Sequence, residues 1–414
     1  MSLGPKSTGA EASLPRILLC SSGVPHPTRG ASTVLFFHYA ERLKREGFCV
    51  RHILLLEGGD WTDDDVAEYR QTIVAEGQFD IAVVRSERFV SEGRLNHMLD
   101  ASASRKFLAE AASFSPDAVV VFDIIAALLA KPLPEPKLVW LGDLRFETVW
   151  YHAWYAALEN PIKAMHLPSN WLGCNAWKRM YLEALKGVRR VLVASSSSVG
   201  VFSKLGIAAT YEPYPWPATG RQVERAPISK PTFLFFGTLT GLGSRSALHL
   251  VLKELVPRLR KKWGRGGFEI LVAGRGQVPG WAARLMAGAK EFRQLGFVED
   301  LDALMASCHA ALVPISVPVG NRSRILTAWS KRLPVLAHSN TALGNPDLMN
   351  GWSAYLASDA DGFVNQMLEL VANPEKSAEI AERGYQIWRD KFGPGPAGNS
   401  LVGHVNEVLS GVTL

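Results

Sequence analysis

The sequence predicts an α/β protein built from two doubly wound, parallel-sheet domains in series. The chain begins with an apolar strand, a loop rich in glycine and proline, an amphipathic helix and a second strand, which is the order that a parallel sheet requires. After a stretch at 211–217 that holds three prolines, the same order begins again with the apolar run 232–236. A chain of 414 residues is long enough for two domains of ordinary size.

The first domain is expected over residues 15–215, after a lead-in at 1–14 that is rich in Ser, Gly, Ala and Pro and that we expect to be disordered. Short apolar runs predict its strands at 16–20, 49–56, 81–84, 118–122, 138–141 and 190–194. Apolar residues at helical spacing predict helices at 30–46, which Gly47 closes, at 95–114, which ends before Ser115 and Pro116, and over much of 147–186.

The second domain is expected over residues 216–390. Its predicted strands are 232–236, 268–273, 310–314 and 334–337, and its predicted helices are 246–262, 281–289, one from 301, 361–371 and 375–392. Residues 391–414, which include the apolar segment 401–409, are predicted to form a helix that packs back on the first domain. Ligands of such sheets bind beyond the carboxyl ends of the strands, so two facing domains would share one interdomain cleft.

The composition narrows the classes of function. A net charge of +6 suits an anionic ligand, an acidic membrane surface or nucleic acid. The sequence has no run of five like charges and no zinc-finger spacing, so we do not expect a nucleic-acid partner. No apolar run reaches the roughly 18 residues that a membrane span requires, so any membrane contact would be peripheral. Four cysteines without a Cys-x-x-Cys pair favour reduced thiols in a cytoplasmic chain.

The segment 319–329 contains the strongest candidate binding motif. Gly320 and Asn321 precede a predicted helix whose first turn carries Arg322 and Arg324. Cations are unfavourable at the positive end of a helix dipole unless an anion is bound there. Backbone N–H groups and two guanidiniums together form a phosphate site. The alternative is that both arginines are solvated or paired with nearby acids.

Two further motifs lie at the ends of predicted strands. Gly274 and Gly276 follow a strand, but the third glycine of a G-x-G-x-x-G dinucleotide fingerprint falls on Pro279. The loop 274–280 is therefore either a tight turn or a different kind of ligand loop. Asp143 and Arg145 follow the strand 138–141, which predicts polar groups at the cleft, although Asp143 could instead cap the next helix.

The segment 147–186 is unusually rich in tryptophan and tyrosine. Such side chains are suited to stacking on sugar rings, or to forming an amphipathic surface for a lipid-linked acceptor. For most of them, a place in a helical core is the simpler expectation. His152 in the same segment is a candidate base, or else a packed or capping histidine.

An ordered set of motifs runs through the second domain, namely Gly237-Thr-Leu, 272–276, 296–301, 311–314, Gly320 with Arg324, and 334–337. In order and spacing, this set resembles the GT-B fold retaining glycosyltransferases of family 4 (glycosyl transferases group 1). The resemblance covers residues 232–345 well and 15–48 more weakly. It implies two Rossmann-like domains facing an interdomain cleft, with a nucleotide-sugar donor on the second domain and an acceptor on the first. It also implies that neither a metal nor another cofactor takes part.

Together with the motifs above, the resemblance assigns roles to individual residues. Those assigned to catalysis are Asp143, Arg245 and Arg324, the two arginines as ligands of the donor diphosphate with Arg322 assisting. The other donor-binding residues are Gly237, Thr238, Arg275, Gly276, Phe297, Val298, Gly320, Asn321, Arg322, Ser323, Ile325 and Thr327. Those expected on the acceptor side are Arg29, Gly30, Arg145 and His152.

Two positions depart from the family's pattern. The family usually has a ribose-binding glutamate where this chain has Thr327. One hydroxyl group cannot offer a ribose diol the pair of acceptors that a carboxylate offers. A second glutamate beside the donor sugar, which many members lack, falls on Val319.

The expected function is the transfer of a sugar from a nucleoside-diphosphate sugar to a glycan, lipid-linked or small-molecule acceptor, with retention and without a metal. The expected setting is the bacterial cytoplasm, in cell-surface polysaccharide biosynthesis, with peripheral association at the inner face of the plasma membrane as a further possibility. Two alternatives stay open. One is a catalytically silent binding subunit, motivated by Val319 and Thr327, and the other is a nucleotide-sugar epimerase of the same fold.

Overall fold

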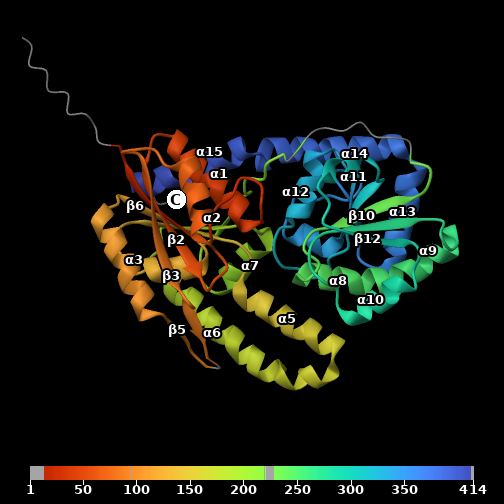
Figure 1. Ribbon diagram of the computed structural model, residues 1–414, viewed down its shortest axis with the longest axis horizontal. Coiled ribbons are helices and arrows are strands. Elements are labelled where there is room, and N and C mark those ends of the chain that lie inside the picture. The colour runs from red at the N-terminus through yellow and green to blue at the C-terminus, as the bar shows by residue number, and fades with distance from the viewer. Residues whose placement is uncertain (1–13, 94, 219, 221–227, 412–414) are drawn as a thin grey trace, which may run out of the picture.

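Two parallel sheets organise the computed structural model, which describes residues 14–93, 95–218, 220 and 228–411 (Figure 1). The first sheet has the strand order β3-β2-β1-β6-β7-β8-β9, and the second has the order β12-β11-β10-β13-β14-β15. Every pair of neighbouring strands in both sheets is parallel. The prediction of two doubly wound α/β domains is therefore confirmed.

The first half contains the larger sheet and its covering helices. Its strands are β1 Arg16–Ser22, β2 Cys49–Glu57, β3 Phe79–Ser86, β6 Ala118–Phe122, β7 Lys137–Leu141, β8 Arg190–Val193 and β9 Thr210–Tyr211, with a separate antiparallel pair, β4 Val90–Glu92 and β5 His97–Leu99. Its helices are α1 Ser32–Arg45, α2 Asp63–Ile73, α3 Ala101–Phe114, α4 Ile124–Ala130, α5 Arg145–Glu159, η1 Pro161–His166, α6 Leu167–Leu185 and α7 Ser196–Lys204.

The second half contains the smaller sheet and ends in three consecutive helical segments. Its strands are β10 Thr232–Phe236, β11 Glu269–Ala273, β12 Phe292–Gly296, β13 Ala310–Val313, β14 Val335–His338 and β15 Tyr355–Ala357. Its helices are α8 Leu242–Leu250, η2 Val251–Leu255, α9 Val256–Trp263, α10 Gly280–Ala287, α11 Leu301–Ala306, α12 Ser323–Ser330, η3 Ser339–Leu343, α13 Ala360–Ala372, α14 Pro374–Ile387, η4 Trp388–Phe392 and α15 Pro394–Ser410.

The central strands are apolar along their whole length because helices cover both faces of each sheet. All five residues of β6 and all five of β10 are buried, as expected for strands inside a parallel sheet. β1 lies between β2 and β6, and β10 lies between β11 and β13. The loops that follow these strands therefore open at the carboxyl edge of each sheet, where ligands of such folds bind.

The start of the helix predicted at 95–114 is wrong. Residues His97–Leu99 form β5 and pair with β4. The helix α3 begins only at Ala101, because Asp100 is its N-cap and accepts a hydrogen bond from the Ser102 N–H at 2.8 Å. An aspartate cap is a strong start signal for a helix, and it lies inside the segment that the apolar periodicity assigned to one element.

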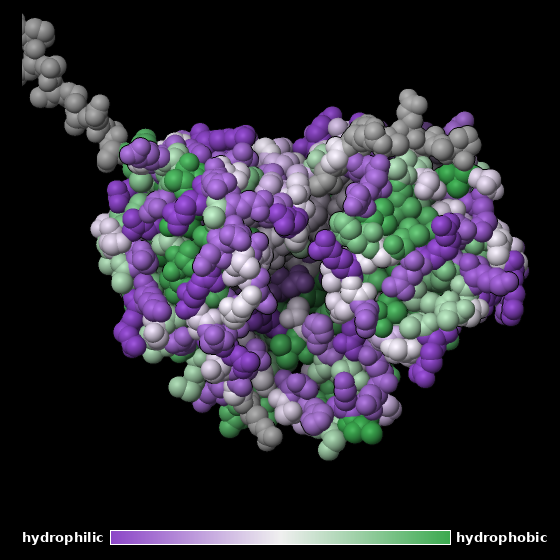
Figure 2. Space-filling view, viewed as in Figure 1, coloured by the Kyte–Doolittle hydropathy of each residue, from purple (hydrophilic) through white to green (hydrophobic). Residues whose placement is uncertain are grey.

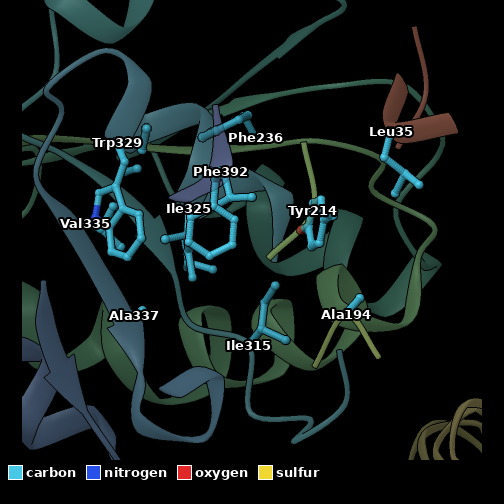
Figure 3. Packing of buried hydrophobic residues seen from close by; sticks show 14 of the residues in the cluster. Leu35, Ala194, Tyr214, Phe236, Ile315, Ile325, Trp329, Val335, Ala337 and Phe392 are labelled. Atoms are coloured by element: carbon cyan, nitrogen blue, oxygen red, sulfur yellow. The ribbon is translucent and has the colours of Figure 1, made fainter. Parts of the chain in front are cut away.

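The C-terminal segment returns to the first half. Helix α15 packs on α1, where Arg42 Nε donates to Asn399 Oδ1 at 2.7 Å. One cluster of buried apolar residues also extends across both halves, and it includes Leu35, Tyr214, Ile315 and Ile325, which are labelled in Figure 3. In the part of the chain that the structure describes, no helix has the length and apolar character needed to cross a bilayer.

Candidate functional site

A cleft of about 920 Å³ separates the two halves at the carboxyl edges of both sheets. Figure 2 shows it as a hollow in the middle of the molecule. Its first-half lining comes from the loops after β1, β6 and β7, and its second-half lining comes from the loop after β10 and the start of α12. Two facing sheets therefore meet at one site, as the sequence predicted.

Two arginines at the start of α12 face this cleft. Arg322 is the N-cap of α12, and Arg324 lies in its first turn. Arg324 Nη2 donates to Ser244 Oγ at 2.6 Å and to the Thr238 carbonyl at 3.3 Å. Arg322 Nη2 donates to the Val317 carbonyl at 3.0 Å. Neither guanidinium forms an ion pair with any carboxylate of the described residues.

Each guanidinium also carries a nitrogen that is buried and has no hydrogen-bond partner, Nε in Arg322 and Nη1 in Arg324. Burial, and then the neighbouring charge of Arg322, lower the pKa of Arg324 to about 10. Burial also lowers the pKa of Arg322, while Asp143 opposes that shift. Two adjacent cations at a helix N-terminus, each with an unused donor, form a site that an anion would satisfy.

The glycine loop after β10 supports this arrangement by allowing a close approach. A Cβ on Gly237 would lie 2.5 Å from Arg324 Nε, so a larger residue would push the guanidinium out of place. Thr238 and Ser244, on either side of the loop, supply the oxygen atoms that hold Arg324. The predicted donor loop and the predicted arginine helix are therefore in direct contact.

Asp143 brings the first half of the chain to the same place. It follows β7 and lines the cleft, and the N-cap of α5 is Leu144, so Asp143 does not cap that helix. A Cβ on Gly320 would lie 1.9 Å from Asp143 Oδ1, and Gly320 has a φ of +77°. Only glycine allows the loop before α12 to lie this close to the carboxylate.

A second carboxylate in the cleft, Asp123, was not identified from the sequence. It directly follows the buried strand β6, at the same sheet edge as Asp143, and that position was the available signal. Its φ of +87° and ψ of 154° fall in a region that non-glycine residues rarely occupy. Asp123 Oδ2 pairs with Arg145 Nη2 at 3.4 Å, so Arg145 is partly neutralised.

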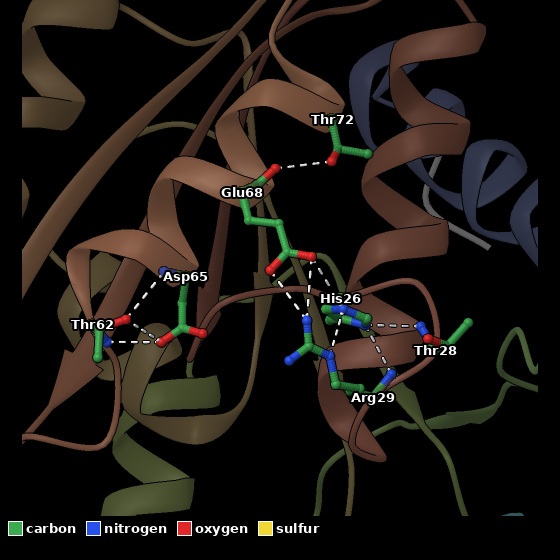
Figure 4. A network of polar contacts seen from close by, with 7 residues as sticks. All are labelled: His26, Thr28, Arg29, Thr62, Asp65, Glu68 and Thr72. Atoms are coloured by element: carbon green, nitrogen blue, oxygen red, sulfur yellow. Dashed lines mark hydrogen bonds and ion pairs between the residues drawn. The ribbon is translucent and has the colours of Figure 1, made fainter. Parts of the chain in front are cut away.

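The predicted acceptor-side residues separate into two groups. Gly30, Arg145 and His152 line the cleft. Burial, and then the charge of Arg245, lower the pKa of His152, so its imidazole is neutral at pH 7. Arg29 does not line the cleft, and it pairs with Glu68 Oε2 at 3.1 Å beside His26, as Figure 4 shows.

Arg245 does not line the cleft of the described structure. Its Nε donates to Glu159 Oε1 at 3.0 Å, and its Nη2 bonds the other carboxylate oxygen. This pair joins α8 of the second half to α5 of the first, and Tyr155 adds a hydrogen bond of 2.9 Å to Ser316 Oγ nearby. In this structure Glu159 therefore occupies two of the donor nitrogens of Arg245.

Thr327 lines the cleft, but its hydroxyl group already has two partners. Trp216 Nε1 donates to Thr327 Oγ1 at 2.9 Å, and this oxygen donates to the Ser323 carbonyl at 3.1 Å. Val319 is 2 % exposed and contributes an apolar wall. The two positions that depart from the family pattern are therefore filled by contacts within the chain.

The predicted site residues can now be sorted by position. Those that line the cleft are Gly30, Asp143, Arg145, His152, Gly237, Thr238, Asn321, Arg322, Ser323, Arg324 and Thr327. Those outside its lining are Arg29, Arg245, Arg275, Gly276, Phe297, Val298, Gly320 and Ile325. Arg275 lies over the ring of Phe297 at 4.4 Å from the centroid.

Glu147, one turn after Asp143, makes the stability of the protein depend on pH. Burial, and then the charge of Asp143, raise its pKa from an ordinary 4.5 to about 7. Because the folded state holds this proton more tightly than the unfolded state, the free energy of unfolding should fall as pH rises from about 4.5 to 7, by on the order of 2–3 kcal/mol. We expect Glu147→Gln to remove this loss, measured by urea unfolding at acidic and alkaline pH. The control is Glu379→Gln at an exposed position, which should leave the pH dependence of the unfolding free energy unchanged. If Glu147→Gln showed the same pH dependence as the wild type, Glu147 would not be its source.

Two Rossmann-like parallel-sheet domains that face one cleft define the GT-B fold. The model of the family "Glycosyl transferases group 1" matches residues 230–373. The family match and the shared fold support a glycosyltransferase of the GT-B type. No curated protein sequence matches the chain significantly.

Solved structures share this architecture over nearly the whole chain. HepE of Anabaena, solved in complex with UDP, has a TM-score of 0.66 and 14% identity, over 95% of this chain and 100% of its own. Sucrose-phosphate synthase from Thermosynechococcus elongatus has a TM-score of 0.67 and 12% identity, over 96% and 100%. TarM has a TM-score of 0.68 and 8% identity, over 96% and 99%. These likenesses establish the GT-B fold.

Proposed function

We propose that the protein is a glycosyltransferase that moves a sugar from a nucleoside-diphosphate sugar to a glycan, lipid-linked or small-molecule acceptor. The observation that carries the proposal is the pair of cleft-facing arginines, Arg322 and Arg324, which lack acidic partners among the described residues and keep unused donors. A diphosphate is an anion of the right chemistry for two guanidiniums and a helix N-terminus. The solved complexes of HepE with UDP, and with UDP and glucose, make uridine the first nucleotide to test.

The proposed reaction retains the configuration of the sugar and needs no metal. Breaking the bond between the sugar and the diphosphate places negative charge on the leaving phosphate. Arg322 and Arg324 would stabilise that charge from fixed positions, which is the most effective form of electrostatic catalysis. Asp143 and His152, which lie on the first-half wall of the cleft, would face the acceptor.

The direct test is transfer or hydrolysis by the purified protein. We expect release of UDP from at least one UDP-sugar, at a rate that a chelator such as EDTA leaves unchanged. A thermal-shift panel of UDP, GDP, TDP and CMP nucleotides should be run first. A ligand at about 100 times its dissociation constant stabilises the fold by roughly 2.7 kcal/mol. No release and no shift with any nucleotide would contradict the proposal.

A catalytically silent subunit of the same fold is the second candidate. The contact between Trp216 and Thr327 favours it, because this contact occupies the hydroxyl group at a position where the family usually has a carboxylate for the ribose. Such a subunit would bind nucleotides and show neither transfer nor donor hydrolysis. Detection of either reaction excludes it.

The proposed setting is the bacterial cytoplasm, in the assembly of a cell-surface polysaccharide. Peripheral association with the inner face of the plasma membrane belongs to this proposal, since a lipid-linked acceptor would be presented there. Cell fractionation tests this proposal by measuring how the native protein divides between the cytosolic and membrane fractions.

A further inference from the structure

The linker between the two halves carries aromatic residues and prolines in alternation. Its sequence from 211 to 217 is Tyr-Glu-Pro-Tyr-Pro-Trp-Pro. Each proline fixes its own φ and biases the residue before it toward an extended conformation, so the linker is stiff. In an extended chain, side chains two positions apart point to the same side, and the rings of Tyr214 and Trp216 have centroids 6.3 Å apart. The linker therefore presents two adjacent aromatic side chains from a backbone with little freedom.

Three side chains of the linker form hydrogen bonds to the start of α12. The Tyr214 hydroxyl donates to the Asn321 carbonyl at 3.1 Å, and Trp216 Nε1 donates to Thr327 Oγ1 at 2.9 Å. The Tyr211 hydroxyl oxygen accepts from Asn321 Nδ2 at 3.4 Å. We call residues 321–324, which include both cleft-facing arginines, the arginine turn. The linker thus holds the chain at the beginning of this turn and again one residue turn later in the helix.

The linker is itself attached to both halves of the protein. Tyr211 belongs to β9 and pairs with Val193 of β8 in the first sheet. Farther along, the Trp216 N–H donates to the Phe392 carbonyl at 2.6 Å, and Trp388 Nε1 donates to the Trp216 carbonyl at 2.9 Å. Both partners of Trp216 belong to η4 of the second half. The linker therefore contacts the arginine turn from a position that is fixed at both of its ends.

The local sequence of the arginine turn does not favour the conformation that it adopts. Arg322 is the N-cap of α12, and an arginine side chain has no oxygen that could accept hydrogen bonds from the first turn. Arg322 and Arg324 are also like charges at the positive end of a helix dipole. The bonds of Arg324 to Ser244 and Thr238 hold one guanidinium, whereas the bond from the linker to the Asn321 carbonyl holds the backbone. Contacts from distant segments therefore stabilise the arginine turn.

We propose that Tyr214 and Trp216 are positioning residues for the diphosphate of the donor. They hold the arginine turn in the conformation in which both guanidiniums line the cleft, and both aromatic side chains line the cleft beside them. Because the linker begins on the first sheet, binding to the second half depends on the contact between the halves. The identity of the ligand rests on the proposed function, whereas the support that the linker gives to the turn does not.

The test compares two tyrosine-to-phenylalanine variants of the full-length protein by calorimetry. Tyr214→Phe keeps the ring and removes the hydroxyl group that holds the Asn321 carbonyl. It should bind UDP about fivefold more weakly than the wild type, and inorganic pyrophosphate by the same factor, because both ligands present a diphosphate. Adding Trp216→Phe should weaken binding at least tenfold. The control is Tyr355→Phe, which removes another buried hydroxyl group, bonded to Ser377 Oγ at 2.9 Å, and should bind both ligands like the wild type.

Hydrogen exchange without ligand tests the support of the turn directly. In Tyr214→Phe, the backbone amides of residues 321–327 should exchange about fivefold faster than in the wild type, and in Tyr355→Phe they should exchange at the wild-type rate. Wild-type exchange in Tyr214→Phe would overturn the proposal. An equal loss of UDP affinity in Tyr355→Phe would also overturn it, because the loss would then follow from general destabilisation.

The two ligands separate the remaining outcomes. If Tyr214→Phe weakened the binding of UDP and not that of pyrophosphate, the linker would act on the nucleoside and the proposal would be overturned. If the wild type bound neither ligand, that result would contradict the proposed function, and the exchange rates alone would then decide whether the linker holds the arginine turn.

Discussion

Arg324→Ala should weaken the binding of UDP by about 100-fold, which corresponds to ~3 kcal/mol. The guanidinium of Arg324, which lines the cleft, is held by Ser244 and Thr238, and its Nη1 is buried without a hydrogen-bond partner. Alanine would remove both the charge and that donor, and no group would remain at this position to bind the diphosphate. Isothermal titration calorimetry measures the change. The UDP affinity of Arg324→Lys should lie between those of the wild type and Arg324→Ala, because lysine keeps the charge and loses the planar fork of donors.

The matched control for Arg324→Ala is Arg258→Ala in the same domain. Arg258 is an exposed arginine paired with Asp361 at 2.8 Å, far from the residues that line the cleft. The Arg258→Ala variant should bind UDP like the wild type, because a surface ion pair contributes little to the stability of the fold. Thermal unfolding without nucleotide shows whether either variant is folded. If a folded Arg324→Ala variant bound UDP as tightly as the Arg258→Ala control, Arg324 would not belong to the donor site.

The elements that the sequence predicted correctly are those with a strong local pattern. The fully buried strands β6 and β10 are continuous apolar runs, and their bounds agree with the prediction. The edge strand β12 was not predicted, because Phe292–Gly296 contains two charged or polar residues and is stabilised by its partner β11 instead. Strand β5 was absorbed into a helix for a similar reason, since three residues carry no period of their own.

The candidate site was predictable where its residues share one loop and not where they meet across the chain. Arg322 and Arg324 were identified from the helix start that carries them, and the structure adds that each keeps a buried nitrogen without a hydrogen-bond partner and that neither forms an ion pair with a described carboxylate. The partners of Thr327 and Arg245 are Trp216 and Glu159, which lie 111 and 86 residues away. No local pattern contains such pairs, because each forms only when segments far apart in the sequence are packed together.

The same distinction applies to the aromatic segment 147–186. Trp177 and Tyr181 are core residues, 1% exposed each, whereas Trp154 and Trp171 are 45% and 56% exposed. The sequence alone offered both interpretations for all of them. Which one holds for each residue depends on the faces that α5 and α6 turn toward their neighbours, and those faces are set by tertiary packing.

Gly274→Ala should destabilise the second half by about 3 kcal/mol and lower its unfolding temperature by about 10 °C. Gly274 directly follows β11 and has a φ of +150°, and an added Cβ would lie 1.9 Å from the Gly237 carbonyl oxygen. That neighbour is backbone, so the ends of β10 and β11 would have to move apart. Because Arg324 lies against Gly237, UDP affinity should fall as well. Circular dichroism during heating and calorimetry measure the two effects.

The control for this variant comes from the same loop. Gly280 begins α10 without a positive φ, and a Cβ there would meet nothing within 4 Å. Gly280→Ala should therefore change stability by no more than about 0.5 kcal/mol, and in the favourable direction, because alanine restricts the unfolded chain. Equal unfolding temperatures for the two variants would mean that the loop relaxes around Gly274 without cost. The close approach of Gly274 to Gly237 would then not be what holds the donor side of the cleft in shape.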